Sequence, residues 1–291
     1  MSKLKFSPVV ESSEAGMGSG FKAFRLGEDS FEGLADPILN IDHFYMRRAT
    51  FPPHPHAGFS AVTYMLPDSE NSFINLDSIG SEEEIRPGDL HWTVAASGIV
   101  HEETPKTDGI VCHGLQIFIN LPEKLRKDSP KVYHLRNEDA PRKILASGKV
   151  EAKVLTGSFE NLRSPIQLAT PVDFLDFAVL GNSEIEITLK NGQNLFVLAL
   201  GENLSLNLNQ PTLDLKNRNA VAMANESSDE QKLPIFIEGK GNIILLRSRP
   251  LKEAFVFKGP FVAKDLASAN MTYQRYKNGE FGSLDGRGVY E

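Results

Sequence analysis

The 291-residue sequence is poor in cysteine and tryptophan and has no long apolar run. A single cysteine, Cys112, excludes an intramolecular disulfide framework and is typical of a reducing compartment. No stretch approaches the roughly 18 apolar residues that a membrane helix needs, and no run of signal-peptide length precedes Glu11 and Glu14. The sequence therefore predicts a soluble cytoplasmic protein with no membrane partner.

An excess of positive charge is also lacking. The chain has 31 Lys and Arg against 38 Asp and Glu, a net charge of -7, which argues against direct binding to nucleic acid through its phosphates. Its 41% hydrophobic and 24% charged residues are typical of a globular protein and exclude a disordered one. At roughly 150 residues per domain, the length predicts two domains.

Histidine is absent from the second half of the chain. All seven histidines precede residue 135: His43, His54, His56, His91, His101, His113 and His134. Any chemistry that needs imidazole is therefore expected in the first half.

Period-two alternation of apolar and polar residues dominates both halves, with turn residues about every ten positions, as in antiparallel sandwiches and barrels. Leu204, Leu206 and Leu208 alternate in this way, and Asn191-Gly192 suits a tight hairpin. Strands are expected over 61–66, 73–76, 90–95 and 115–119.

A polar stretch with a proline over 137–148 predicts the interdomain connection, and so domains of residues 1–136 and 137–291. One short helix is expected near the C-terminus. Leu266, Ala269, Tyr273 and Tyr276 fall on one of its faces, and Gly279 stands where it would stop. The fold class is all-β, with two barrels and a short C-terminal helix.

Two pairs of side chains carry metal-ligating chemistry. His54 and His56 point to one face of a strand, as do His101 and Glu103, because residues two apart on a strand share a face. Pro55 holds the first pair extended. The 44 residues between His56 and His101 suffice for two or three strands that bring the pairs face to face across a small barrel.

Three imidazole nitrogens and one carboxylate oxygen form a donor set of intermediate softness. It suits Fe, Mn, Co, Ni, Cu or Zn rather than Ca or Mg, and leaves coordination positions open for substrate or dioxygen. A lone His-x-His on a strand is more often a pair of ordinary polar residues. Spacing alone leaves both interpretations open.

Motifs along nearly the whole chain resemble those of the pirins, a family of the cupin superfamily. They are the segments 36–44 (DPILNIDHF), 51–59 (FPPHPHAGF), 86–92 (RPGDLHW), 97–103 (SGIVHEE), 113–122 (HGLQIFINLP), 259–262 (GPFV) and 276–282 (YKNGEFG).

The resemblance implies a bicupin, two jelly-roll barrels of the double-stranded β-helix type. It is compatible with a monomer and leaves the oligomeric state open. It implies one Fe(II)-type metal in the N-terminal barrel, bound by the residues that match the family's ligands, His54, His56, His101 and Glu103, and a C-terminal barrel without metal. Some pirins open the flavonol quercetin with dioxygen. Others are redox-sensitive partners of transcriptional regulators or metabolic enzymes.

Several neighbours of the expected pocket depart from the pirin pattern: Ala57, Ser60, Asn75, His91 and Ala96. We expect Ala57, Ser60 and His91 to line the substrate pocket, although strand parity could equally put His91 on the outer face. These departures bear on the choice of substrate, whereas the four residues that match the metal ligands are retained. Glu102 should point away from the metal and is the reserve ligand.

The first functional hypothesis is a quercetin 2,3-dioxygenase, which acts on a flavonol-like aromatic enol with dioxygen and uses Glu103 as a metal ligand and proton acceptor. The alternative is a non-enzymatic iron or redox sensor that binds a protein partner, and a third interpretation is a metal-free relic. His43 is expected to be structural. Cys112 and His113 should face opposite ways, which argues against a Cys-His nucleophile.

Overall fold

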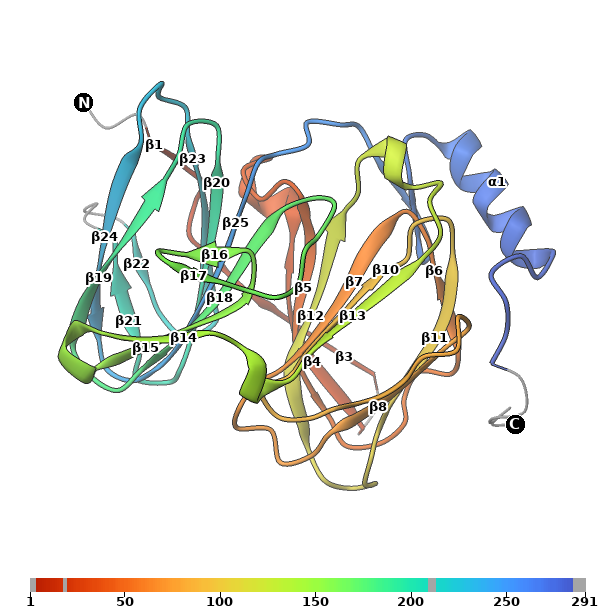
Figure 1. The fold of residues 1–291 in the computed structure, drawn as a ribbon, viewed down its shortest axis with the longest axis horizontal. Helices are drawn as coiled ribbons and strands as arrows, with labels where there is room; N and C mark the ends of the chain where they lie inside the picture. Colours follow the sequence, from red (N-terminus) through yellow and green to blue (C-terminus); the bar gives the residue numbers. More distant parts are fainter. Residues whose placement is uncertain (1–3, 18–19, 209–212, 285–291) are drawn as a thin grey trace. The chain divides into compact units, whose positions relative to one another are not determined.

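The computed structural model describes residues 4–17, 20–208 and 213–284, most of them in strands (Figure 1). The chain divides into two compact units. We call the first the N-terminal unit; it consists of Glu14–Arg25, Ile38–Glu138 and Leu251–Glu291. The C-terminal unit holds Met1–Ser13, Leu26–Pro37 and Asp139–Pro250.

Neither unit is the contiguous stretch that the sequence predicts. The chain passes from the N-terminal to the C-terminal unit after Glu138, two residues beyond the expected boundary at 136. However, Met1–Ser13 belongs to the C-terminal unit and Leu251–Glu291 belongs to the N-terminal unit. The reason is strand pairing, since β1 (Leu4–Phe6) and β2 (Val10–Glu11) pair with β23 (Asn219–Asn225). Composition along the chain carries no signal for such long-range pairing.

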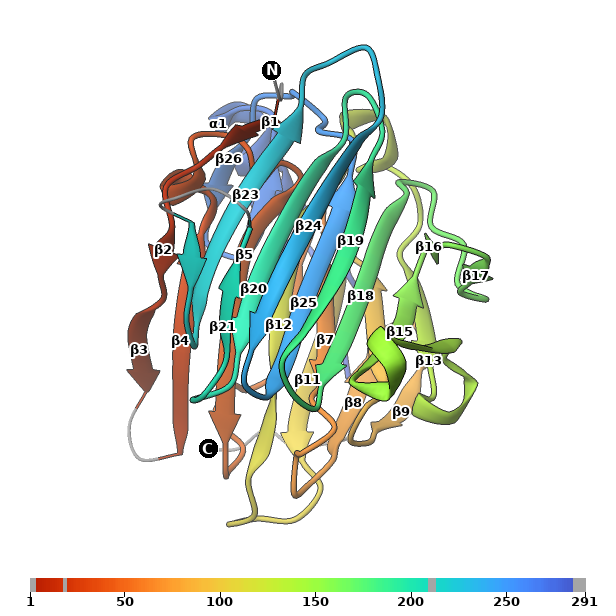
Figure 2. The ribbon, with the colours of Figure 1, turned by 90° about the vertical axis from the view of Figure 1, so that its left-hand side faces the viewer.

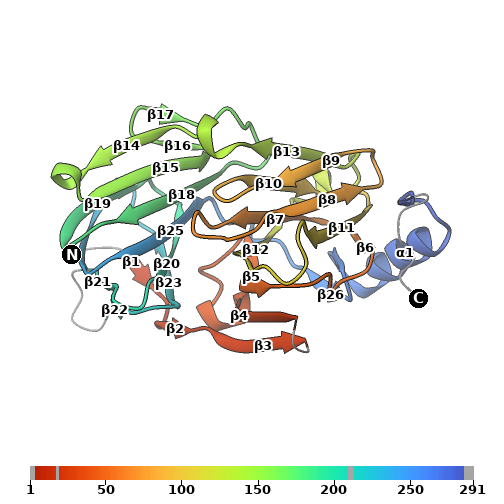
Figure 3. The same cartoon turned by 90° about the horizontal axis from the view of Figure 1, so that it is seen from below.

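Two main antiparallel sheets build the N-terminal unit, and the strands of the larger one run side by side in Figure 3. The larger sheet has the order β13-β10-β7-β12-β5-β4-β3, with strands Lys131–Leu135, Leu90–Val94, Phe59–Met65, Cys112–Asn120, Ile38–Met46, Phe21–Gly27 and Ser13–Met17. The smaller has the order β6-β11-β8-β9, with strands His54–His56, Ile99–Pro105, Phe73–Asp77 and Glu82–Ile85. The strands expected in the first half are confirmed.

The C-terminal unit also has two main sheets, and Figure 2 shows β23, β20, β25 and β18 side by side. Its larger sheet contains β1, β2, β23, β20 (Asn194–Leu200), β25 (Gly241–Ser248), β18 (Val172–Val179), β15 (Val150–Thr156) and β14 (Arg142–Leu145). Its smaller sheet contains β19 (Ser183–Leu189), β24 (Gln231–Glu238), β21 (Ser205–Asn207) and β22 (Asp214–Leu215). Short strands β16 (Ser158–Phe159) and β17 (Leu162–Arg163) pair with each other.

Apolar side chains fill the interior of the C-terminal unit. Alternate positions of β18 and β20 supply Leu175, Phe177, Leu195 and Val197, all at most 1% exposed. These hydrocarbon side chains have no nitrogen or carboxylate oxygen that could bind a metal ion.

The Asn191-Gly192 turn differs from the predicted hairpin. Gly192 has a φ of +68°, as a tight turn needs, but β19 pairs with β24 and β20 pairs with β23 and β25. The turn therefore carries the chain from one sheet to the other. Local sequence specifies the turn conformation, whereas the sheet that each strand joins depends on distant partners.

The C-terminal segment of the N-terminal unit forms a hairpin, β26 (Val256–Lys258) and β27 (Phe261–Ala263), and then the predicted helix α1 (Leu266–Lys277). Asp265 caps the helix by accepting from the backbone N–H of Ser268 at 2.7 Å. The helix face that carries Leu266, Ala269 and Tyr273 is unevenly covered, because Leu266 is 64% exposed whereas Ala269 is buried.

The 3-10 helices are short, at Glu28–Phe31, Glu123–Leu125, Asn137–Asp139 and Ala146–Gly148. Among the described residues, none of the helices has the length and apolar character that a bilayer crossing needs.

Candidate metal centre

Strands β6 and β11 bring three histidines together. His101 lies directly opposite His54 in their antiparallel register, and Ile99 lies opposite His56. One ring nitrogen from each of His54, His56 and His101 falls within 4.8 Å of the others, so these residues form a group that could bind a metal ion. The pairs meet on neighbouring strands of one sheet, and not face to face across a barrel as expected, because β6 and β11 hydrogen-bond to each other.

Hydrogen-bond acceptors next to the Nδ1 atoms of His54 and His101 determine which ring nitrogen carries the proton. His54 Nδ1 lies 2.9 Å from the carbonyl oxygen of Pro52, and His101 Nδ1 lies 3.3 Å from Asn75 Oδ1. With both Nδ1 protons donated to these oxygens, both Nε2 atoms keep a lone pair.

The two Nε2 atoms of His54 and His101 are 3.1 Å apart. In these tautomers no proton lies between the two lone pairs, and a cation would stabilise the contact. Two ligands at about 2.1 Å from a metal and at right angles would lie about 3.0 Å apart. The residues present therefore fit a metal ion.

Burial keeps all three imidazoles neutral. Desolvation lowers the pKa of His54, lowers that of His56 to about 3, and lowers that of His101 well below its usual range, with further lowering of the last two by the neighbouring histidines. Neutral imidazole is the form that binds a metal.

Glu103 lies two residues from His101 but is not among the three grouped ligands. Its Oε1 lies 2.5 Å from the Thr63 hydroxyl on β7, which in turn lies 3.1 Å from Gln116 Oε1. Burial raises the pKa of Glu103 to about 7, against the lowering effect of the hydrogen bond from Thr63. A carboxyl group with this pKa can hold or release a proton near neutrality. Glu103 as a metal ligand stays a prediction.

A cavity of about 470 Å³ opens at the three histidines and at Glu103. Phe21, Phe44, Phe51, Phe73, Phe118 and Met46 form most of its apolar wall. Its polar wall includes Gln116 and the pair of Arg25 and Asp42, in which Arg25 Nε and Nη2 each donate to one Asp42 oxygen at 2.7 Å.

The three expected pocket residues Ala57, Ser60 and His91 are not in this wall. Ala57 packs with Phe261 because it follows His56 and so faces the other way. Ser60 is buried within the larger sheet, 1% exposed. A role for these three in substrate binding stays a prediction.

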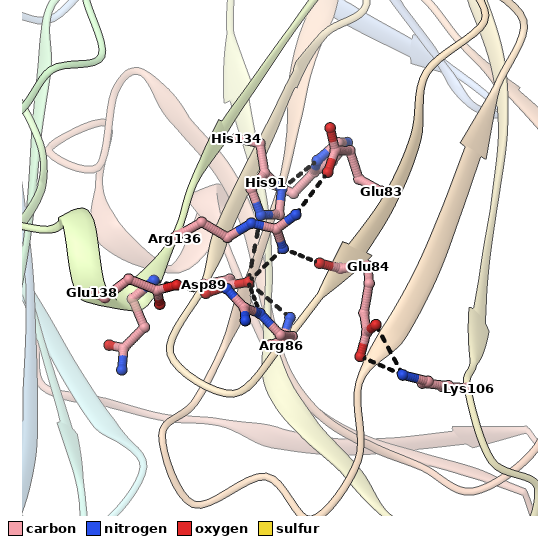
Figure 4. Close-up of polar contacts among 10 residues, drawn as sticks. Glu83, Glu84, Arg86, Asp89, His91, Lys106, His134, Arg136 and Glu138 are labelled. Carbon is pink, nitrogen blue, oxygen red and sulfur yellow. Dashed lines mark hydrogen bonds and ion pairs between the residues drawn. The ribbon is translucent and has the colours of Figure 1, made fainter.

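His91 pairs with His134 on the neighbouring strand β13, with their Nδ1 atoms 3.4 Å apart (Figure 4). His134 lies 3.4 Å from Asp89, a fully buried carboxylate that also accepts from Arg136 Nη1 at 3.1 Å. Burial, ahead of the nearby charges of His134 and Arg136, lowers the pKa of His91 to about 3. His91 thus belongs to a buried polar network that contains Asp89.

Several residues of the site have no distinctive sequence signal. Thr63 on β7 and Gln116 on β12 lie opposite each other in the antiparallel register, and the sequence does not distinguish them from the other polar residues of these strands. Asn75 attracts attention in the sequence only as a departure from the family pattern, yet it orients His101. Glu102 has the opposite parity to Glu103, as expected, and does not line the cavity.

Two units built from paired antiparallel sheets, one of them with three converging imidazoles that could bind a metal ion, define a two-domain protein of the cupin class. A model of the pirin family matches residues 25–119, and a model of the pirin C-terminal cupin domain matches residues 174–282. The chain belongs to the pirin family.

Relatives and solved structures agree with this assignment. The chain is 31% identical over 258 residues to Pirin-1 of Arabidopsis thaliana, covering 86% of this chain and 84% of that protein. Its fold is similar to that of a quercetin 2,3-dioxygenase from Acinetobacter baumannii, with a TM-score of 0.84 and 22% identity over 97% of this chain and 100% of that one. It is also similar to the Escherichia coli pirin YhhW in complex with nickel(II), with a TM-score of 0.64 and 17% identity over 85% and 99% of the two chains.

Proposed function

We propose that the protein is a dioxygenase of the quercetin 2,3-dioxygenase type, with Fe(II) held by His54, His56, His101 and Glu103. The observation that carries the proposal is the position of three neutral imidazoles at one end of a largely aromatic cavity. The name of the Acinetobacter baumannii neighbour supports this choice of reaction.

The cavity supports a flat aromatic substrate. Its volume of about 470 Å³ lies within the roughly 300–1,000 Å³ of small-molecule sites. Phe44 and Phe73 stack with a centroid distance of 5.3 Å and an angle of 3°, so this part of the wall is planar. An aromatic enol of the flavonol type would be held against these rings, which exclude water from its reacting oxygens.

When bound, the metal supplies Lewis acidity and open coordination positions. The protein's own part in the reaction is to orient the substrate and to manage its proton. Glu103 would take the proton of the enol hydroxyl at its carboxylate, held in place by Thr63, and return it to the product. Flavonol and dioxygen would give a ring-opened ester and carbon monoxide, so all atoms are accounted for.

The test is aerobic turnover of quercetin by protein loaded separately with Fe, Mn, Co or Ni. Loss of quercetin absorbance and release of carbon monoxide are both measured. We expect turnover with at least one metal, and a loss of about 100-fold or more in Glu103→Gln because a general base contributes about 10²-fold to 10⁴-fold.

Glu102→Gln is the matched control, since the same change one residue away falls on the opposite face of β11. It should retain turnover within about twofold. Metal content is measured on every sample, so that failure to bind metal can be distinguished from failure to turn over quercetin. Stoichiometric metal in His54, His56 and His101 without turnover of quercetin would refute the substrate and favour the alternative of a binding protein.

A further inference from the structure

A second pair of histidines meets on the opposite face of the larger sheet. His43 on β5 and His113 on β12 place their Nε2 atoms 2.6 Å apart. Phe44, which lines the metal cavity, follows His43 directly, and neighbouring residues on a strand point to opposite faces. The pair is therefore separate from the cavity and from the three histidines of the candidate metal centre.

The pair is held from several sides. Asp68 Oδ1 accepts from His113 Nδ1 at 2.8 Å, which directs the His113 Nε2 lone pair toward His43. Tyr45 stacks on His113 with a centroid distance of 4.4 Å and an angle of 10°, and Phe24 lies against His43 at 6.1 Å. His43 and His113 stand on strands in the interior of the larger sheet, which fixes the direction in which their ring nitrogens point.

We propose that His43 and His113 form a second site for a divalent transition-metal ion of the zinc, nickel or copper class. Metal-binding histidines commonly donate their other ring N–H to a carboxylate, and Asp68 would serve as that carboxylate for His113. With only two protein ligands, water completes the coordination. The proposal does not depend on the dioxygenase function.

Binding would require His43 to change tautomer. One hydrogen now has to lie between the two Nε2 atoms 2.6 Å apart, and ligands at about 2.1 Å from a metal at right angles need about 3.0 Å. As the metal binds, the proton of His43 would move from Nε2 to Nδ1 by exchange with solvent, so both imidazoles stay neutral with no net proton released, and the rings would separate by a few tenths of an ångström. Asp68 favours the cation, whereas Lys22, 4.8 Å from the Phe24 ring and ion-paired with Glu14 at 3.1 Å, is a nearby positive charge.

The experiment measures zinc bound per chain at equilibrium with about 50 µM free Zn²⁺, followed by Cu²⁺ binding and electron paramagnetic resonance. We expect two zinc ions in the wild-type protein, and one in His43→Phe and in His113→Phe, which keep the ring volume. Asp68→Asn should weaken the second site about tenfold. The His54→Ala variant should lose the ion of the cavity and keep the second one, with two nitrogen ligands in its Cu²⁺ spectrum.

Two results would overturn the proposal. One is a wild-type protein whose single zinc ion is lost in His54→Ala, and the other is two zinc ions in both phenylalanine variants, which would mean an adventitious ion only. Retention of the cavity's zinc by His43→Phe and His113→Phe, together with unchanged circular dichroism, shows that these variants are folded. Failure of quercetin turnover has no bearing on either count.

Discussion

Replacement of Gly58 by alanine should damage the candidate metal centre from outside the ligand set. Gly58 follows His56 by two residues and has a φ of +87°, which L side chains adopt at a cost of about 1–2 kcal/mol. A Cβ at this position would lie 1.8 Å from the carbonyl oxygen of Val262 and 2.9 Å from its carbon. Since these are backbone atoms of β27, the clash cannot be relieved by a side-chain rotation.

To clear that overlap β27 must move by roughly 1 Å or more, since ordinary contacts of a carbon atom begin at about 3.5 Å. The hydrogen bond from the Val262 N–H to the Ala57 carbonyl, 2.9 Å long, would then break at a cost of about 0.5–1.5 kcal/mol. With the backbone term, Gly58→Ala should lose roughly 1.5–3.5 kcal/mol of unfolding free energy. For a unit of this size, that corresponds to roughly 3–14 °C in the melting temperature.

Gly80→Ala is the matched control, because Gly80 has a φ of +89° in the same unit and an added Cβ would meet nothing within 4 Å. It should lose only the backbone term of about 1–2 kcal/mol. Thermal unfolding and metal content are measured on both. Metal content should fall in Gly58→Ala because His56 shifts with its strand. Equal losses of stability in the two variants, with equal metal content, would refute the close-approach argument.

Burial raises the pKa of Asp89, but the hydrogen bonds that it accepts, one from Arg136 among them, outweigh this and bring the pKa to about 2. This pKa lies below the roughly 3.9 of an unfolded aspartate, so the Asp89 carboxylate contributes about 2 kcal/mol to the free energy of unfolding above pH 4, and this contribution is lost between about pH 4 and 2. In urea titrations, Asp89→Asn should therefore be less stable than the wild type at pH 7, and its stability should fall less on acidification. Burial raises the pKa of Cys112 to about 12, so a thiol reagent at pH 8 should label it only after unfolding, and labelling of the native protein would contradict its burial. Arg25→Met leaves the buried Asp42 carboxylate without its bidentate partner and should cost about 1–2 kcal/mol, since Arg25 is half exposed, whereas the double variant with Asp42→Asn should cost less.

Much of the candidate site follows from the sequence because strand parity is a local property. His54 and His56 share a face, as do His101 and Glu103, whatever the strands pair with. The absence of histidine after residue 134 already places imidazole chemistry in the first half. The two-barrel fold, the short helix near the C-terminus and the pirin assignment were likewise predicted and are confirmed.

Pairing between distant strands was decided only by the tertiary structure. That β6 lies beside β11, that Asn75 and Thr63 support His101 and Glu103, and that β1 joins the C-terminal unit all depend on contacts between residues far apart in the chain. A periodic pattern tells which face of a strand is buried but not which strand lies next to it, because many antiparallel registers bury the same apolar face. The sequence by itself determined the donor atoms, and the tertiary structure decided their neighbours.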